Sequence, residues 1–195
     1  MKRRAWVAVL AVLVGGCVFR NASGPRYFAP DPVVVEEPAG DQAALSRKPV
    51  PIRLRSVHGI SFLRERIVWR VSPVEYGRYE QRLWRELPAS YVERALLTAL
   101  GRTPGLLLSD DPHAAALSVE VVAFEEVLAP AHTAAVALET SLRDPRRGRL
   151  LDRTFTATAP IDRDDPETMA KAMGRALHEA TSAVAVAVAT AARRR

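Results

Sequence analysis

The side chains that could do chemistry in this 195-residue chain are four histidines, several carboxylate pairs and a few glycine-rich segments. The histidines lack the short spacings of zinc ligands, and the chain has a single cysteine, so we interpret them as loop or surface residues. They are His58, His113, His132 and His178. No G-x-x-x-x-G-K-S/T, G-x-G-x-x-G or G-x-S-x-G motif occurs, so the common signatures of phosphate binding, dinucleotide binding and serine hydrolysis are missing.

Two groups of acidic residues have simpler explanations than catalysis or metal binding. Glu125 and Glu126 fall in an alternating segment. Adjacent side chains on a strand point to opposite faces, so these carboxylates make a poor catalytic pair. The run Asp162–Asp165 lacks the glycine and the glutamate that a calcium loop needs at its sixth and twelfth positions, and we interpret it as the cap of a following helix. The sequence therefore predicts a protein that is not an enzyme and holds no metal.

Cys17 has the clearest chemical role because of the residues that precede it. Three cations at residues 2–4 and an uncharged apolar run at 5–14 lead to two glycines, which is the layout of a secretory signal peptide. The run is shorter than the roughly 20 residues that cross a bilayer. V-G-G-C resembles the lipobox of bacterial lipoproteins, which implies removal of residues 1–16 and attachment of diacylglycerol to Cys17. An ordinary signal peptide with a chance cysteine and an uncleaved anchor are the alternatives.

The size and charge of the remaining chain indicate a single folded domain that does not bind nucleic acid. Removal of residues 1–16 leaves 179 of 195 residues, which suffices for one domain with a core that needs no disulfide. The formal charge of +6 includes the three cations of residues 2–4, which leaves +3, and three further cations stand at residues 193–195. No stripe of basic and aromatic residues occurs, so we expect no nucleic-acid partner.

Proline-rich composition predicts a spacer between Cys17 and the folded domain. Six of the 14 prolines lie in residues 18–51, and such segments favour extended, semi-rigid conformations. We therefore divide the chain into a signal peptide (1–16), a lipidated linker (17–49) with a short strand near 26–35, and a periplasmic α+β domain (50–195).

The apolar pattern of this domain predicts strands and two helices. Strands are expected at residues 52–57, 66–71, 74–84, 106–108, 116–128, 133–143 and 150–159, the last three as an antiparallel meander. A capping box from Ser90 to Glu93 predicts the start of one helix, and the run Asp164-Asp165-Pro166-Glu167, with an Asx N-cap and proline in the first turn, predicts the start of a terminal helix. This order indicates an α+β fold: a mixed, largely antiparallel sheet with two main helices packed on one face.

Four aromatic residues lie close together in the first half of the domain, and two interpretations of them stay open. They could form a hydrophobic surface that binds a partner, or they could pack in the core. These residues are Trp69, Tyr76, Tyr79 and Trp84.

The order of these landmarks resembles a known family. After Cys17 come Y-F-A-P-D-P (27–32) and R-I-V-W-R-V-S-P-V-E-Y-G-R-Y-E-Q-R-L-W-R-E-L-P (66–88), then a capped helix, a strand meander and a terminal helix. The pattern resembles the ABC-type transport auxiliary lipoprotein family, which includes the lipoprotein component of paraquat-inducible, Mce-type envelope transport systems.

The resemblance implies a non-catalytic adaptor that carries no cofactor beyond the acyl lipid on Cys17. It implies partnership with an Mce-domain protein and an ABC permease and ATPase that move lipids or other hydrophobic molecules. It also implies a lipid anchor on the periplasmic face of the outer membrane, with which Val18 is consistent. A homo-oligomer would suit such an adaptor.

Two other function classes compete with the transport adaptor. A structural or assembly lipoprotein that supports an outer-membrane barrel or a secretion complex would have the same anchor and the same compact domain. A lipoprotein hydrolase would need a nucleophile and a base, and no motif for either occurs in the sequence.

Overall fold

The computed structural model describes residues 24–30 and 48–194. The expected signal peptide, Cys17 and the linker segment 31–47 lie outside the described residues. The described elements are β1 (Arg26–Phe28), β2 (Val50–Gly59), β3 (Arg66–Ser72), β4 (Glu75–Trp84), α3 (Pro88–Arg102), β5 (Leu106–Leu108), β6 (Ala115–Val127), β7 (Thr133–Asp144), β8 (Gly148–Pro160) and α4 (Pro166–Arg193).

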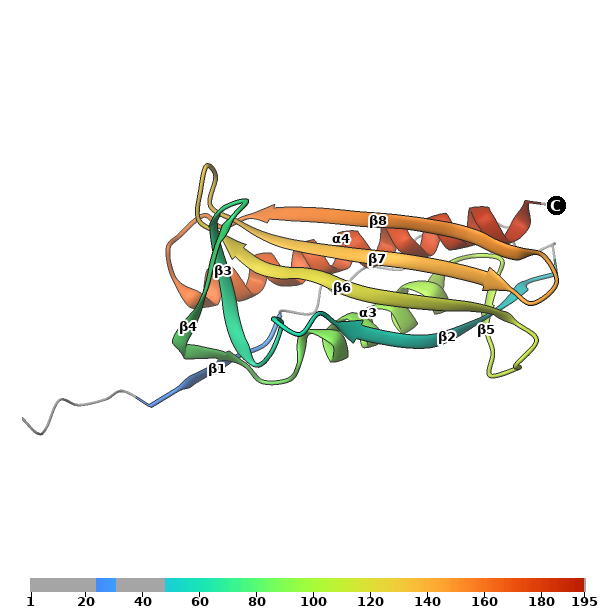
Figure 1. Cartoon of the computed structure of the whole chain (residues 1–195), viewed down its shortest axis with the longest axis horizontal. Helices are drawn as coiled ribbons and strands as arrows, with labels where there is room; N and C mark the ends of the chain where they lie inside the picture. Colours follow the sequence, from blue (N-terminus) through green and yellow to red (C-terminus); the bar gives the residue numbers. More distant parts are fainter. Residues whose placement is uncertain (1–23, 31–47, 195) are drawn as a thin grey trace, which may run out of the picture.

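Strand β6 is the centre of one mixed sheet of eight strands. On one side it pairs with β7, which pairs with β8, and both ladders are antiparallel. On the other side the first half of β6 pairs in parallel with β2, and its last residues pair in parallel with β3. The order β1-β4-β3-β6-β2-β5 completes the sheet. The predicted strands and the meander of β6, β7 and β8 are confirmed (Figure 1).

Both helices pack on the same face of the sheet, as predicted (Figure 1). The buried side of α4 contains Met169 and Met173 followed mainly by alanine and valine, and these small side chains allow the helix to lie close to β7, β8 and α3. Alternate residues of β6 and β7 that point to the helices, such as Leu117 and Leu138, are fully buried. The core therefore lies between the sheet and the two helices.

Helix α3 begins three residues earlier than the capping box predicts. Pro88 occupies the first turn after Leu87, which is extended and makes no side-chain cap. Proline favours this position because its fixed φ suits a helix and its missing N–H needs no partner there. Ser90 lies inside the first turn, where its backbone N–H donates to the Leu87 carbonyl at 2.9 Å. The predicted capping role of Ser90 is therefore wrong.

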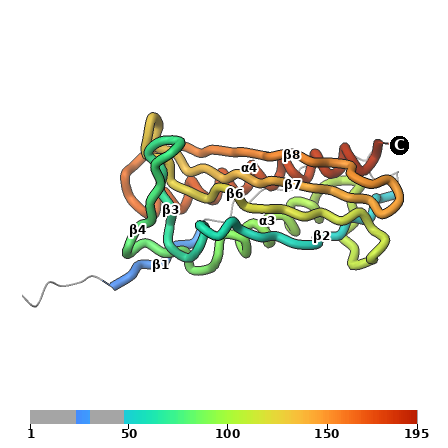
Figure 2. The backbone as a smooth tube through the Cα atoms, in the orientation of Figure 1, coloured from blue at the N-terminus to red at the C-terminus, as the bar shows by residue number. Residues whose placement is uncertain are grey.

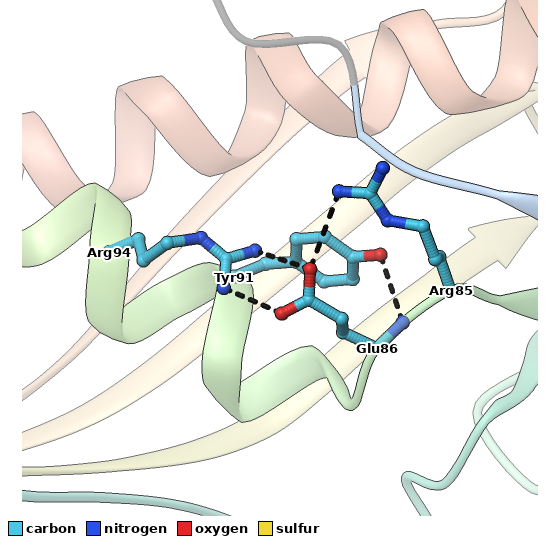
Figure 3. A network of polar contacts seen from close by, with 4 residues as sticks. All are labelled: Arg85, Glu86, Tyr91 and Arg94. Carbon is cyan, nitrogen blue, oxygen red and sulfur yellow. Dashed lines mark hydrogen bonds and ion pairs between the residues drawn. The ribbon is translucent and has the colours of Figure 1, made fainter.

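A polar network fixes the start of α3 in place of a cap (Figure 3). The backbone N–H of Glu86 donates to the hydroxyl of Tyr91 at 3.1 Å, and the carboxylate of Glu86 accepts from both terminal nitrogens of Arg94 at 2.6 and 3.1 Å. Arg85 adds a contact of 3.4 Å. Hydrogen bonds from Arg94, with a smaller effect of Arg85, lower the pKa of Glu86 from its ordinary value.

The start of α4 agrees with its prediction. Asp165 is the N-cap, and its carboxylate accepts from the backbone N–H and from the hydroxyl of Thr168, both at 2.8 Å. At the other end, Arg147 from the β7–β8 turn donates to the carbonyl of Arg194 at 2.8 Å and to that of Ala192 at 3.3 Å. This cation stabilises the negative end of the helix dipole.

Candidate functional site

The β3–β4 hairpin crosses one end of the long strands β6, β7 and β8 (Figure 2). We use the name hairpin end for residues 60–84 together with 122–133 and 161–168, which meet there. Directly paired residues share a face of the sheet, so the pairing of β3 with β4 and β6 divides the side chains of the hairpin end into two sets. One set points toward the helices and the other points away from them.

The outer set surrounds a small hollow. Arg70 donates to the buried carboxylate of Glu125 at 2.5 Å. Tyr76 is 47% exposed, its ring meets Phe62 edge to face at 6.5 Å, and the guanidinium of Arg78 lies 4.1 Å over the Phe62 ring. The hollow has a volume of about 270 Å³ and is lined by Ile60, Phe62, Leu63, Tyr76, Val122 and Glu125. This arrangement provides a mainly apolar surface with one neutralised charge pair.

The inner set includes Trp69, whose ring occupies the space beside Gly77 that a larger side chain would fill. Trp69 pairs with Gly77 across the hairpin, and a Cβ at residue 77 would overlap the ring of Trp69. Tyr79 lies on the same face, half-buried, with the guanidinium of Arg82 4.2 Å from its ring centre. Burial raises the pKa of the Tyr79 hydroxyl, and the neighbouring Glu126 carboxylate raises it further.

Trp84 belongs to the core and does not belong to a partner surface. It is 1% exposed, and its ring meets Phe124 at 5.2 Å and Tyr91 at 6.3 Å, both edge to face. The predicted partner-binding group of four aromatics therefore divides: Trp84 is inaccessible, Tyr76 lies on the outer face, and Trp69 with Tyr79 lies on the inner face. Alternation along β4 separates Tyr76 from Tyr79, and the register shift between Arg66 and Val68 in the β3–β4 ladder changes the facing of the strand before Trp84.

Glu126 is the centre of a polar cluster that the sequence analysis missed. It is 1% exposed on the inner face, and its Oε1 lies 2.7 Å from Nε2 of His132 in the β6–β7 loop. Arg82 lies 3.8 Å from Oε2. The Asp164 carboxylate completes a group whose ligand-type atoms, with those of Glu126 and His132, all lie within 4.8 Å of one another. Imidazole and carboxylate groups are common metal ligands, so these three residues could together hold a metal ion.

The local sequence indicated part of the cluster formed by Glu126, His132 and Asp164. Glu125 and Glu126 do point to opposite faces, as predicted, and His132 is a loop residue, as predicted. Two consecutive acids at the end of an apolar strand were the available signal, because at least one of them must lie on the buried face. The contact with Asp164, far along the chain, had no signal in the spacing.

A second open surface runs along strand β8. This strand pairs with β7 alone among the described residues, so one edge of its backbone is free of a neighbouring strand. A groove of about 810 Å³ lies between β8 and the second half of α4, where Val186 is 62% exposed. A free strand edge is a site at which another strand can add.

Neither α3 nor α4 is both long and apolar enough to cross a membrane.

The comparisons with known proteins agree with this architecture. A family model described as "ABC-type transport auxiliary lipoprotein component" matches residues 33–185. The match covers most of the chain, so the protein belongs to the family of ABC-type transport auxiliary lipoproteins. It is accordingly a component of an ABC-type transport system, with an auxiliary role and with transporter partners. None of the curated proteins matches the chain.

Solved structures show the same fold at low sequence identity. Protein XCC0632 from Xanthomonas campestris is 20% identical, with a TM-score of 0.70 over 85% of this chain and 96% of its own. An uncharacterised protein is 16% identical, with a TM-score of 0.65 over 85% of this chain and 99% of its own. The hypothetical protein CT253 from Chlamydia trachomatis is 9% identical, with a TM-score of 0.55 over 74% of this chain and 98% of its own. At these identities the likeness concerns the fold.

Proposed function

We propose that this protein is a lipid-anchored adaptor on the periplasmic face of the outer membrane. It would serve an Mce-type ABC transport system that moves lipids or other hydrophobic compounds, and it would carry no catalytic function of its own. The observation that carries the proposal is the family match over residues 33–185. The signal-like start and the lipobox-like V-G-G-C at Cys17 support the anchor.

The position of β1 supports a definite orientation of the domain. Residues 26–28 pair with residues 82–84 of β4, at the hairpin end. Nine residue steps separate Cys17 from Arg26, and a chain spans at most about 3.5 Å per residue, so a lipid on Cys17 would stay within about 30 Å of β1. The C-terminus of α4 lies at the opposite end of the elongated molecule (Figure 1). We propose that the hairpin end faces the membrane and that β8 and α4 extend into the periplasm.

The outer face of the hairpin end is the partner surface that we propose, with Tyr76 at its centre. Tyr76 is exposed beside the apolar hollow, and Val74 in the hairpin turn is 90% exposed. Tyrosine is among the residues most enriched at the energetic hot spots of protein interfaces. Trp69 and Tyr79 would act indirectly, because they support the hairpin from its inner face.

A crosslinking experiment tests the proposed function. Tagged full-length protein would be crosslinked in intact cells and purified from membranes, and its partners would be identified by mass spectrometry. Recovery of an Mce-domain protein with an ABC permease and ATPase is the expected result. Recovery of a barrel or of secretion components instead would favour the assembly lipoprotein.

Matched variants separate the anchor from the partner surface. Cys17→Ser should release the protein from membranes, and continued membrane association would contradict the lipid anchor. Tyr76→Ala should lower partner recovery at least several-fold. Tyr27→Ala, which removes a 63% exposed tyrosine from β1, is the control and should leave recovery unchanged. Equal recovery with both variants would remove Tyr76 from the interface.

The free edge of β8 supports a further part of the proposal, the assembly of several copies. A strand or loop of a second copy could add to this edge beside the groove with α4. Light scattering of the purified protein in detergent would test this, and a monomer at all accessible concentrations would contradict it.

A further inference from the structure

We infer that Glu126, His132 and Asp164 form a binding site for a divalent transition metal, with Zn²⁺ as the best match. The three residues come from the end of β6, the β6–β7 loop and the residue before the N-cap of α4. Their ligand-type atoms lie within 4.8 Å of one another. One imidazole and two carboxylates are a ligand set that zinc accepts, with a fourth position left open for water or for a group from a partner.

The geometry needs only small movements to close around an ion. Zinc lies about 2.1 Å from its nitrogen and oxygen ligands, so ligand atoms in a tetrahedral site stand roughly 3.4 Å apart. Nε2 of His132 and Oε1 of Glu126, now at 2.7 Å, would separate slightly, and Asp164 would approach. Glu126 is held by the sheet, whereas His132 lies in a loop and Asp164 is exposed. His132 and Asp164 are therefore the residues that would move, and their positions in the fold allow this movement.

The state of the Glu126 carboxylate is the independent observation that points to a ligand. The side chain is 1% exposed, and Oε2 makes no hydrogen bond among the described residues, although the Tyr79 hydroxyl lies beside the carboxylate. Its nearest cation is Arg82 at 3.8 Å. A buried carboxylate needs strong partners, because its desolvation is costly. A metal ion at this group would supply the missing partner.

Arg82 reduces the attraction of this site for cations without removing it. Its guanidinium lies 4.2 Å from the centre of the Tyr79 ring and approaches only Oε2 of Glu126. Two carboxylates against one guanidinium leave the cluster with one net negative charge when His132 is neutral. The ion would join the β6–β7 loop and the start of α4 to the sheet, and so hold the hairpin end together.

Metal titration of the purified full-length protein in detergent tests the inference. After treatment with a chelator, the protein should bind one Zn²⁺ per chain by calorimetry, and excess Zn²⁺ should raise the thermal midpoint by about 5 °C. Mg²⁺ and Ca²⁺ should have no effect, because imidazole is a poor ligand for both. Absence of zinc binding would overturn the inference.

Two variants and one control assign the binding to these residues. His132→Ala and Asp164→Asn should each weaken zinc binding at least tenfold. Asp164 is exposed, so its variant keeps the fold even if replacement of His132 disturbs the loop. His113→Ala, at an exposed histidine in the β5–β6 loop, should bind zinc like the unchanged protein. Zinc binding that persists in both cluster variants, or that is lost in the control, would overturn the assignment.

Discussion

Replacement of Trp84 by alanine should destabilise the domain strongly, because this side chain belongs to the core. Its ring is 1% exposed and touches the edges of Phe124 and Tyr91, which join β4, β6 and α3. Removal of a buried aromatic typically costs about 3–5 kcal/mol, through lost burial and the cavity left behind. For a domain of this size each kcal/mol lowers the thermal midpoint by about 2–4 °C, so the midpoint should fall by about 10 °C.

The assay is urea unfolding followed by circular dichroism, with two comparison variants. Trp84→Phe retains an aromatic ring and should cost about 1–2 kcal/mol. Trp69→Ala removes a tryptophan of the same hairpin that is only partly buried, and it should cost about 1 kcal/mol. The order of free energies of unfolding should therefore follow burial.

If Trp84→Ala lowered the free energy of unfolding by less than about 1 kcal/mol while it abolished the recovery of transporter partners, the residue would act at an interface and not in the core. Partner recovery must be measured well below the thermal midpoint of each variant, so that loss of binding is not a consequence of unfolding.

Three further predictions concern helix starts, the hairpin and acidic pH. Ser90→Ala should leave the thermal midpoint within about 1 °C, whereas Asp165→Ala should lower it by about 3 °C, because only Asp165 caps a helix; equal effects would contradict this assignment. Gly77→Val should displace the Trp69 ring, which would appear as a shift of tryptophan emission with a lower unfolding midpoint, and an unchanged spectrum would count against the close approach. Backbone N–H groups that donate to Asp144 and Asp165 lower the pKa of each carboxyl in the folded state. Their stabilising effect is therefore complete above the usual pKa of about 4 and is lost as the pH falls through the lower folded-state value. Urea midpoints measured from pH 6 to pH 2 should fall more steeply for the unchanged protein than for the variant with both residues changed to asparagine.

The start of α3 shows why local patterns can mislead. Ser90 and Glu93 satisfy the capping-box spacing, and the same segment also contains Pro88, which is a strong candidate for the first helical turn. The helix begins at Pro88 because Glu86, Tyr91 and Arg94 form a network that fixes the chain just before this proline. That network depends on side chains that meet only after the helix has formed.

The four aromatics of the hairpin show a different limit. Their types and spacing identified a hydrophobic segment, but core packing and partner binding both use such residues. Pairing with β6 decided between them, because it determined which face of the hairpin met the helices. Trp84 became core, and Tyr76 stayed exposed.

The sequence by itself determined the elements of this protein and much of its class. Alternation of apolar residues produced the strands, Asp165 and Pro166 began α4, and the antiparallel meander followed from strands joined by short turns, since all of these depend on residues near one another in the chain. The tertiary structure alone decided that β2 and β3 share one side of β6, and that Glu126 meets His132 and Asp164. Parallel pairing and the cluster join residues far apart in sequence, and what selects such contacts is the burial of a common core and not any local preference.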